Sequence, residues 1–372
     1  MEQKHYELAS QLRHQLHQHP ELSLEENWTR QHVMEFLKAH TNFEVVDMGR
    51  WCYARYNSGS DLPGIAFRAE LDALPVLDDI DAPHVSKIAG HGHKCGHDGH
   101  MASLCGLALE LEQKGADRDV YLIFQHAEEI GAGGEECAAM LPEKNIGYAY
   151  GWHNRPVMPK GMIQTMDSTM YYASKGMILH FDGVPSHASM PEAGRCPAFA
   201  ISKIVSAIPA LVDRKNWEGE VFCTVIQVDV GEPAFGTQAS RGELLLTIRG
   251  QYEREMDALQ AKLEAMAEEY AKMDGLEWNV HFCDEFPESA NNPEATKRIR
   301  DAARKLGLVY REAPHAYRGS DDFGYYPKKA CGAMFEIGSG EDCPPIHTVH
   351  YDFPDDILPV AVDLMWELTR KD

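Results

Sequence analysis

Long apolar runs are absent from this chain of 372 residues. Nowhere do about 18 apolar residues follow one another, and the first residues lack the apolar core of a signal peptide. Positive charge is also scarce: 35 Lys and Arg stand against 58 Asp and Glu, a net charge of -23 that repels nucleic acids and anionic membranes. We therefore expect a cytoplasmic protein whose partners include neither nucleic acid nor membrane.

The cysteines are too scattered for a disulfide framework. Nine of them, an odd number, are spread over a long chain without a signal peptide, which favours free thiols in a reducing compartment. Internal repeats and low-complexity linkers are missing too. What remains is a globular composition, 44% hydrophobic and 25% charged, and a length that predicts two domains.

The first half of the chain alternates helices and strands. Apolar spacing predicts a helix over Gln3–Leu16, and Ser23 with Glu26 resembles a capping box that opens a second helix ending near Ala39. The later elements expected here are strands at 43–46, 53–56, 64–68 and 120–125 and a helix at 99–114. This alternation predicts an α/β domain with a mostly parallel sheet covered by helices, and catalytic groups at strand ends.

A second, inserted domain is expected over residues 174–284. Its predicted elements follow a β-α-β-β-α-β order, which is typical of a ferredoxin-like α+β domain. Residues 1–173 and 285–372 then form the first domain, because helix and strand alternation resumes after the insertion.

The densest chemical signal is the segment Gly90–His100, which contains four histidines, a cysteine and an aspartate in a loop that opens a helix. A thiolate and an imidazole two residues apart, as at Cys95 and His97, can bind one transition-metal ion, and the glycines let the backbone fold closely around it. A solvated histidine-rich loop is the alternative. The cluster alone does not distinguish a structural from a catalytic metal site.

A second signal follows the apolar strand that ends at Gln125. Glu128 and Glu129 are adjacent carboxylates before a glycine-rich turn, so one can bind metal while the other faces a water molecule. A surface charge pair is the alternative reading. His153 and His347 lie in segments that we expect to be loops, where a single histidine is more often structural than a ligand.

Taken together, these segments resemble the M20 metallopeptidase family, in particular its amidohydrolase branch of aminoacylases, hippurate hydrolases and auxin-conjugate hydrolases. The resemblance spans nearly the whole chain in order, and the combination is specific although no single motif is. The matching segments are Leu16–Ser23, Phe67–Pro75, Cys95–His100, Ala127–Glu129, Gly151–His153, Ser186–Pro191, Ser320–Phe323, and His347 with Tyr351–Phe353.

The resemblance implies a catalytic domain that binds two divalent ions and an inserted lid that also forms a homodimer. The implied metal ligands are Cys95, His97, Glu129, His153 and His347. Glu128 would be the general base that takes a proton from the attacking water and returns it to the departing amine. His187, in the inserted domain, would stabilise the oxyanion of the tetrahedral intermediate.

Further residues are implied with less direct roles. Asp72 and Asp98 would contact the ligands, and His126, an additional imidazole beside the Glu pair, would alter the metal number or join these contacts. Arg249 aligns with an arginine of the lid motif that would bind substrate, although a structural strand residue is the alternative. Three positions depart from the family pattern: Glu70 replaces a common Asp, His126 a common Pro, and Gly236 an Asn implicated in substrate or oxyanion binding. Because of Gly236, the substrate's carboxylate or acyl end is expected to be held differently here.

The expected activity is metal-dependent hydrolysis of the amide bond of N-acyl amino acids or related small amides. A dipeptidase or small-peptide carboxypeptidase of the same family is one alternative, and a catalytically degenerate relative that only binds a ligand is another. A cysteine hydrolase built on Cys95 is less attractive, because the sequence supplies a surplus of metal-ligand groups. One thiolate with imidazoles and a carboxylate suits Zn, Mn, Co or Ni, so the metal stays open.

Overall fold

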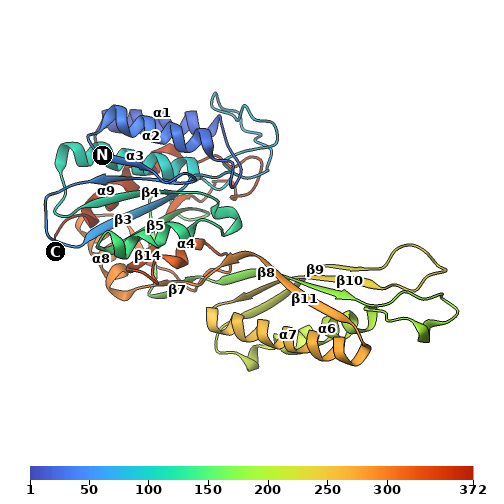
Figure 1. Ribbon diagram of the computed structural model, residues 1–372. Coiled ribbons are helices and arrows are strands. Elements are labelled where there is room, and N and C mark those ends of the chain that lie inside the picture. Colours follow the sequence, from blue (N-terminus) through green and yellow to red (C-terminus); the bar gives the residue numbers. More distant parts are fainter. Residues whose placement is uncertain (372) are drawn as a thin grey trace. The chain divides into compact units, whose positions relative to one another are not determined.

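The chain divides into two compact units in the computed structural model, which describes residues 1–371 (Figure 1). The first unit comprises Met1–Met170, Ser289–Ala316 and the chain from Asp321 onward, and the second comprises Tyr171–Glu288 with Tyr317–Ser320. Residues 171–173, 285–288 and 317–320 were expected in the first domain but belong to the second unit. Residues 317–320 do so because Arg318 pairs with Glu220 at 3.0 Å and its carbonyl accepts from Arg249 at 2.9 Å.

An eight-stranded sheet forms the centre of the first unit, in the order β1-β2-β4-β3-β5-β14-β6-β13. The pairs β4–β3, β3–β5, β5–β14 and β6–β13 are parallel, and the remaining three pairs are antiparallel. Its strands are β1 Glu44–Asp47, β2 Cys52–Tyr56, β3 Gly64–Glu70, β4 Val120–Gln125, β5 Ile146–Pro156, β6 Ile163–Thr165, β13 Tyr310–Glu312 and β14 Cys331–Gly340. Two short strands, β7 Ser168–Tyr171 and β12 Ser289–Asn291, form a separate pair.

The central strands form because their sequences are mostly apolar. Every residue of β3 and β4 is buried, as expected for parallel strands that are covered on both faces. Two charged side chains interrupt this pattern, Arg68 and Glu70, each 1% exposed. They lie near the carboxyl end of β3, where the site begins.

Helices pack against this sheet through one contiguous apolar core. The helix α3, which begins at His97, packs on β3 and is flanked by α1, α2 and α9 (Figure 1). Its first turn approaches the chain near Phe353 so closely that a Cβ at Gly99 would lie 2.3 Å from that ring. The helices of this unit are α1 Gln3–His17, α2 Asn27–His40, α3 His97–Lys114, α4 Gly134–Ala138, α5 Met140–Glu143, α8 Pro293–Lys305 and α9 Leu358–Leu368.

The second unit is a four-stranded antiparallel sheet with two helices. Its chain order is β8 Ala173–Asp182, α6 Ala198–Leu211, β9 Val221–Val230, β10 Arg241–Gly250, α7 Glu253–Asp274 and β11 Glu277–Phe286. The strands lie in the order β11-β8-β10-β9, and both helices share an apolar core with β8 and β10. This is the β-α-β-β-α-β arrangement expected of a ferredoxin-like domain.

The capping box predicted from Ser23 and Glu26 was wrong. Ser23 Oγ donates to Asp72 Oδ2 at 2.7 Å, and Glu26 accepts from the Ala127 N–H at 2.7 Å. The second and third N–H groups of α2, at Trp28 and Thr29, donate instead to the carboxylate of Glu21 at 3.1 and 2.8 Å.

No helix among residues 1–371 has both the length and the apolar character that crossing a bilayer requires.

Candidate metal centre

The first ligand segment lies at the start of α3. Gly96, which precedes the helix, has a φ of +100°, and a Cβ there would lie 2.3 Å from Asn154 Oδ1. Only glycine therefore fits, and it lets the chain turn so that Cys95 and His97 both point toward the same region. The Nδ1 atom of His97 lies 2.9 Å from the Asp72 carbonyl oxygen, which leaves Nε2 directed toward the other ligands.

The second segment follows β4. Ala127 has a φ of +51°, and its N–H is fixed by the Glu26 carboxylate, so the strand turns sharply before Glu128 and Glu129. These two residues begin a short 3-10 helix, Glu128–Ile130. The Glu129 N–H donates to Asp72 Oδ2 at 3.0 Å, and Asp72 thus contacts both ligand segments.

The remaining two ligand candidates come from β5 and from the loop after β14. His153 was expected in a loop but lies within β5, where its Nδ1 is 2.9 Å from the Asn154 carbonyl oxygen. His347 has a left-handed φ of +62°, and its side chain is 50% exposed. The structure therefore brings groups together from four separate parts of the first unit.

The distances between these groups define one cluster. Cys95 Sγ lies 3.3 Å from the Nε2 atoms of both His153 and His347. His97 Nε2 lies 3.7 Å from a carboxylate oxygen of Glu128 and 3.7 Å from one of Glu129, and His347 Nε2 lies 3.8 Å from Glu129. Among the five expected ligands and Glu128, three overlapping groups could each bind an ion, with donor atoms within 4.8 Å of one another: Cys95, His97 and His153; Cys95, Glu129 and His347; and His97, Glu128 and Glu129.

The cluster leaves buried donor atoms without partners. His97 Nε2 and Glu129 Oε1 are both buried and have no hydrogen-bond partner, although such atoms are costly to bury unpaired. They come from different segments and lie 3.7 Å apart. The residues therefore fit a bound metal ion, which would satisfy both atoms.

The pKa shifts within the cluster also fit a bound cation. Burial and the Glu129 carboxylate raise the pKa of the Cys95 thiol well above its ordinary range. Burial raises the pKa of Glu129 to about 7, and burial together with Asp321 raises the pKa of Glu128 well above 4.5. Burial alone would lower the pKa of His97, but the surrounding carboxylates raise it to about 10. A divalent cation reverses such shifts, because it stabilises the thiolate and the carboxylates.

Of the three residues expected to contact the ligands, only Asp72 does so among the described contacts. Asp72 does so, through the bond to Glu129 and a 3.5 Å approach to His97 Nδ1. Asp98 lies in the first turn of α3 but faces away from the cluster, toward His17 at 2.8 Å and Arg13 at 3.0 Å. His126 is buried with its Nε2 3.6 Å from Glu136, and none of its described contacts reaches a predicted ligand.

A chain of buried polar residues behind the cluster had no predicted role. His100 lies 2.6 Å from Glu70 and 2.7 Å from Asn154, whose amide donates to the Tyr351 hydroxyl at 2.7 Å. Arg68 ion-pairs with Glu70, with Asp321 at 2.7 Å and with Asp322 at 2.6 Å. Arg68 and Glu70 were recognisable in the sequence as charges inside an otherwise apolar strand.

The other expected residues lie in the second unit. His187 is exposed, and its Nδ1 accepts from the Ser189 N–H at 3.2 Å. Its backbone pairs with Thr237 next to Gly236, where a Cβ would have open space. Arg249 donates to the Ser320 hydroxyl at 2.9 Å.

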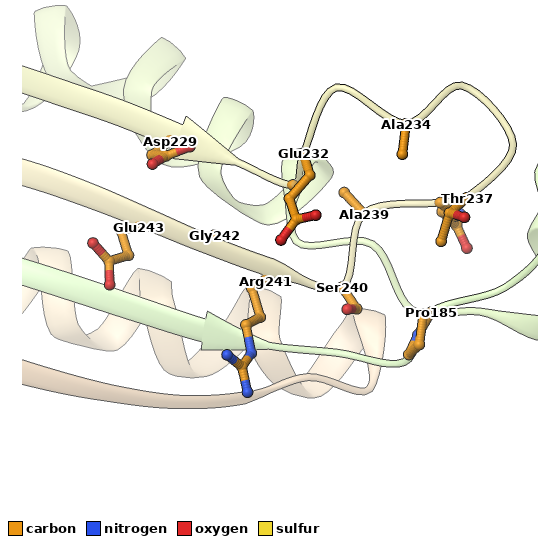
Figure 2. Close-up of a pocket in the computed structure, with 12 residues that line it drawn as sticks. Pro185, Asp229, Glu232, Ala234, Thr237, Ala239, Ser240, Arg241, Gly242 and Glu243 are labelled. Atoms are coloured by element: carbon orange, nitrogen blue, oxygen red, sulfur yellow. The ribbon is translucent and has the colours of Figure 1, made fainter.

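A cavity of about 580 Å³ lies beside this segment, at the end of the β9–β10 hairpin (Figure 2). Figure 2 shows Asp229, Glu232, Arg241 and Glu243 around it, all from the second unit. It contains no predicted metal ligand and neither His187 nor Arg249. We therefore do not assign the reaction to it.

Comparisons with known proteins identify the relatives of this chain. It is 28% identical to the N-acetylcysteine deacetylase of Bacillus subtilis (strain 168) over 336 residues, 88% of this chain and 87% of the relative. The structure of the Bacillus subtilis YXEP protein, a dinuclear metal-binding peptidase of the M20 family, matches with a TM-score of 0.84 and 25% identity, covering 99% and 98% of the two chains. A protein of methicillin-resistant Staphylococcus aureus shares the fold, with a TM-score of 0.89, 24% identity, and 98% and 96% coverage.

The sequence profile of peptidase family M20/M25/M40 matches residues 66–371, which include all five expected ligands and both adjacent glutamates. The chain belongs to this family and is a metal-dependent hydrolase.

Proposed function

We propose that this protein hydrolyses the amide bond of N-acyl amino acids, with two divalent ions at the cluster and Glu128 as general base. The observation that carries the proposal is the pair of buried ligand atoms without hydrogen-bond partners, His97 Nε2 and Glu129 Oε1, beside the carboxylate of Glu128, which is the expected general base. A purely structural metal site would not require that additional carboxylate.

Cys95, His97, Glu129, His153 and His347 would bind the ions. When bound, such ions lower the pKa of a water molecule and polarise a carbonyl group. The donor set of one thiolate, imidazoles and a carboxylate suits Zn, Mn, Co or Ni.

Glu128 moves the proton in the proposed reaction. Burial and the neighbouring carboxylates of Asp321, Glu129 and Asp322 raise its pKa, which makes its ionised form a stronger base. In that form it would take a proton from the attacking water and then give it to the departing amine. His187 would stabilise the negative charge on the carbonyl oxygen of the tetrahedral intermediate. Arg249 and the open space at Gly236 would contribute to substrate binding.

The substrate class is inferred from the relatives. The named activity of the Bacillus subtilis relative is deacetylation of N-acetylcysteine, an N-acyl amino acid. A dipeptidase or small-peptide carboxypeptidase is the second candidate, because the YXEP protein is named a peptidase. Release of free amine from a panel of acylated amino acids and dipeptides, measured with metal content, decides between them. Inactivity on both panels with full metal occupancy would instead favour a degenerate ligand-binding relative.

We also propose a homodimer through the second unit. The outer strand β9 has one unpaired edge in its sheet, and Val225, Ile226 and Val228 on it are 38%, 59% and 50% exposed. Such an edge is a template for pairing with a second copy. Light scattering after size-exclusion chromatography should give twice the chain mass, and Ile226→Lys should give the single-chain mass.

A cytoplasmic location is also proposed, because nine free cysteines, Cys95 among them, suit a reducing compartment.

A further inference from the structure

A lysine lies buried beside the cluster without contacting any predicted ligand through its side chain. Lys94 precedes Cys95 and is 0% exposed. Its Nζ forms an ion pair with Asp78 and donates to the Tyr351 carbonyl oxygen at 2.7 Å. Lysine is almost never fully buried unless it is paired, and a buried ion pair is weak evidence for added stability. Stabilisation of the fold is therefore not a sufficient reason for this buried ion pair.

Lys94 contacts both ends of the loop segment from His347 to Tyr351. The carbonyl oxygen of Lys94 accepts from the His347 N–H at 2.6 Å, while its ammonium group contacts the Tyr351 carbonyl. Lys94 thus contacts both ends of residues 347–351. His347 needs such support, because its φ of +62° is disfavoured for a residue with a Cβ and its side chain is half exposed.

Asp78 connects Lys94 to the helix that carries another ligand. Its second oxygen accepts from the Ser86 N–H at 2.7 Å and lies 3.1 Å from His17 Nε2. The other nitrogen of His17 lies 2.8 Å from Asp98, in the turn of α3 that contains His97. The loop of His347 is therefore linked to the start of α3 through buried groups.

We propose that Lys94 is a positioning residue that fixes His347 for the ion shared by Cys95, Glu129 and His347. It binds no metal itself. This inference rests on the two-metal site proposed above. The ion that Cys95, His97 and His153 would bind takes none of its ligands from the 347–351 loop, so replacing Lys94 should weaken it less than the ion at His347.

The test compares variants at Lys94 and a control variant with the wild-type protein, using Zn²⁺ alone as the probe. Metal content after dialysis and competition with a chromophoric chelator give the number of ions and their affinities. Lys94→Met should keep one ion at wild-type affinity and bind the other roughly 10- to 100-fold more weakly, the range found when partners of metal ligands are removed. Lys87→Met is the matched control, because Lys87 is exposed, and it should bind both ions as the wild-type protein does.

Two further variants separate positioning from folding. In Lys94→Met with Asp78→Asn, the uncompensated charge is removed, so the melting temperature of the metal-free protein should recover while the second ion stays weakly bound. In a His347→Ala background, Lys94→Met should weaken metal binding no further, since both changes act on the same ligand.

The inference is overturned if Lys94→Met binds both ions with wild-type affinity, or if the double variant with Asp78→Asn recovers both stability and the second ion. A wild-type protein that binds only one ion would instead refute the two-metal site and this inference with it. The two failures are therefore distinguishable.

Discussion

Asp72 contacts the ligand segments after β4 and at the start of α3: its carboxylate accepts from the Glu129 N–H at 3.0 Å, and its carbonyl oxygen lies 2.9 Å from His97 Nδ1. The residue is fully buried, so neither contact exchanges with bulk water. The orientation of His97 and the turn that carries Glu128 and Glu129 are therefore set by the same side chain and backbone.

Asp72→Asn should weaken metal binding by about 10- to 100-fold, because an amide NH2 group would replace an acceptor that faces the Glu129 N–H. Titration with Zn²⁺ against a competing chelator measures the change. Ser23→Ala is the control, since it removes only the hydroxyl that donates to Asp72, and its effect should be clearly smaller. Equal affinities in Asp72→Asn and wild type would contradict the orienting role.

Glu128→Gln should retain the metal ions but lose turnover by roughly 10² to 10⁴-fold, the range for removal of a general base. Metal content and the rate of amine release are measured on the same preparation. Glu135→Gln, at an exposed position of the following helix, should be as active as the wild-type protein. Undiminished hydrolysis by Glu128→Gln would show that another group takes the proton.

Removal of metal should lower both activity and thermal stability. Without a cation the buried thiol and carboxylates of the cluster lose the positive charge that stabilises their ionised forms. A ligand at 100 times its dissociation constant adds about 2.7 kcal/mol to the free energy of unfolding. Calorimetry before and after chelation, and after return of Zn²⁺, gives the shift. A melting temperature and a rate that both survive complete chelation would rule out a metal-dependent reaction.

The acid stability of the first unit should depend on Glu110. Burial opposes its ionisation, but Lys114, the Glu2 N–H and His5 outweigh burial and lower its pKa from 4.5 to about 2. A carboxyl whose pKa is lowered by folding stabilises the protein above the unfolded value. This stabilisation is present above pH 4.5 and is lost as the pH falls toward 2.

Glu110→Gln should therefore unfold at lower denaturant concentration than wild type at pH 7. The difference between the two midpoint concentrations should disappear as the pH falls from 4.5 to 2. Urea titrations across this range measure it. Glu269→Gln, at an exposed position of α7, should track the wild-type protein at every pH. A gap of constant size would mean that Glu110 acts through packing rather than charge.

The sequence predicted the elements with strong local signals. The strand Val120–Gln125 was placed at its observed bounds, because a short apolar run between polar segments has few other interpretations. The ligand motifs were also recognisable, since they are dense in residues that rarely cluster by chance.

What depended on contacts between distant residues was not predictable. The cap of α2 comes from Glu21, whose carboxylate reaches back to Trp28 and Thr29, whereas Ser23 and Glu26 have the expected spacing but bind Asp72 and Ala127. His153 was expected in a loop because glycine and polar residues surround it, yet pairing with β14 extends β5 through it. Long-range pairing overrides local propensity in such cases.

The exposure of His347 has a kinetic consequence. Cys95 and His97 are 6% and 1% exposed, whereas half of the His347 side chain faces solvent. Water can thus displace His347 from a bound ion while Cys95 and Glu129 still bind that ion. The two ions proposed here should therefore exchange at different rates, the one at His347 leaving first and being replaced first when the metal supply of the surroundings changes.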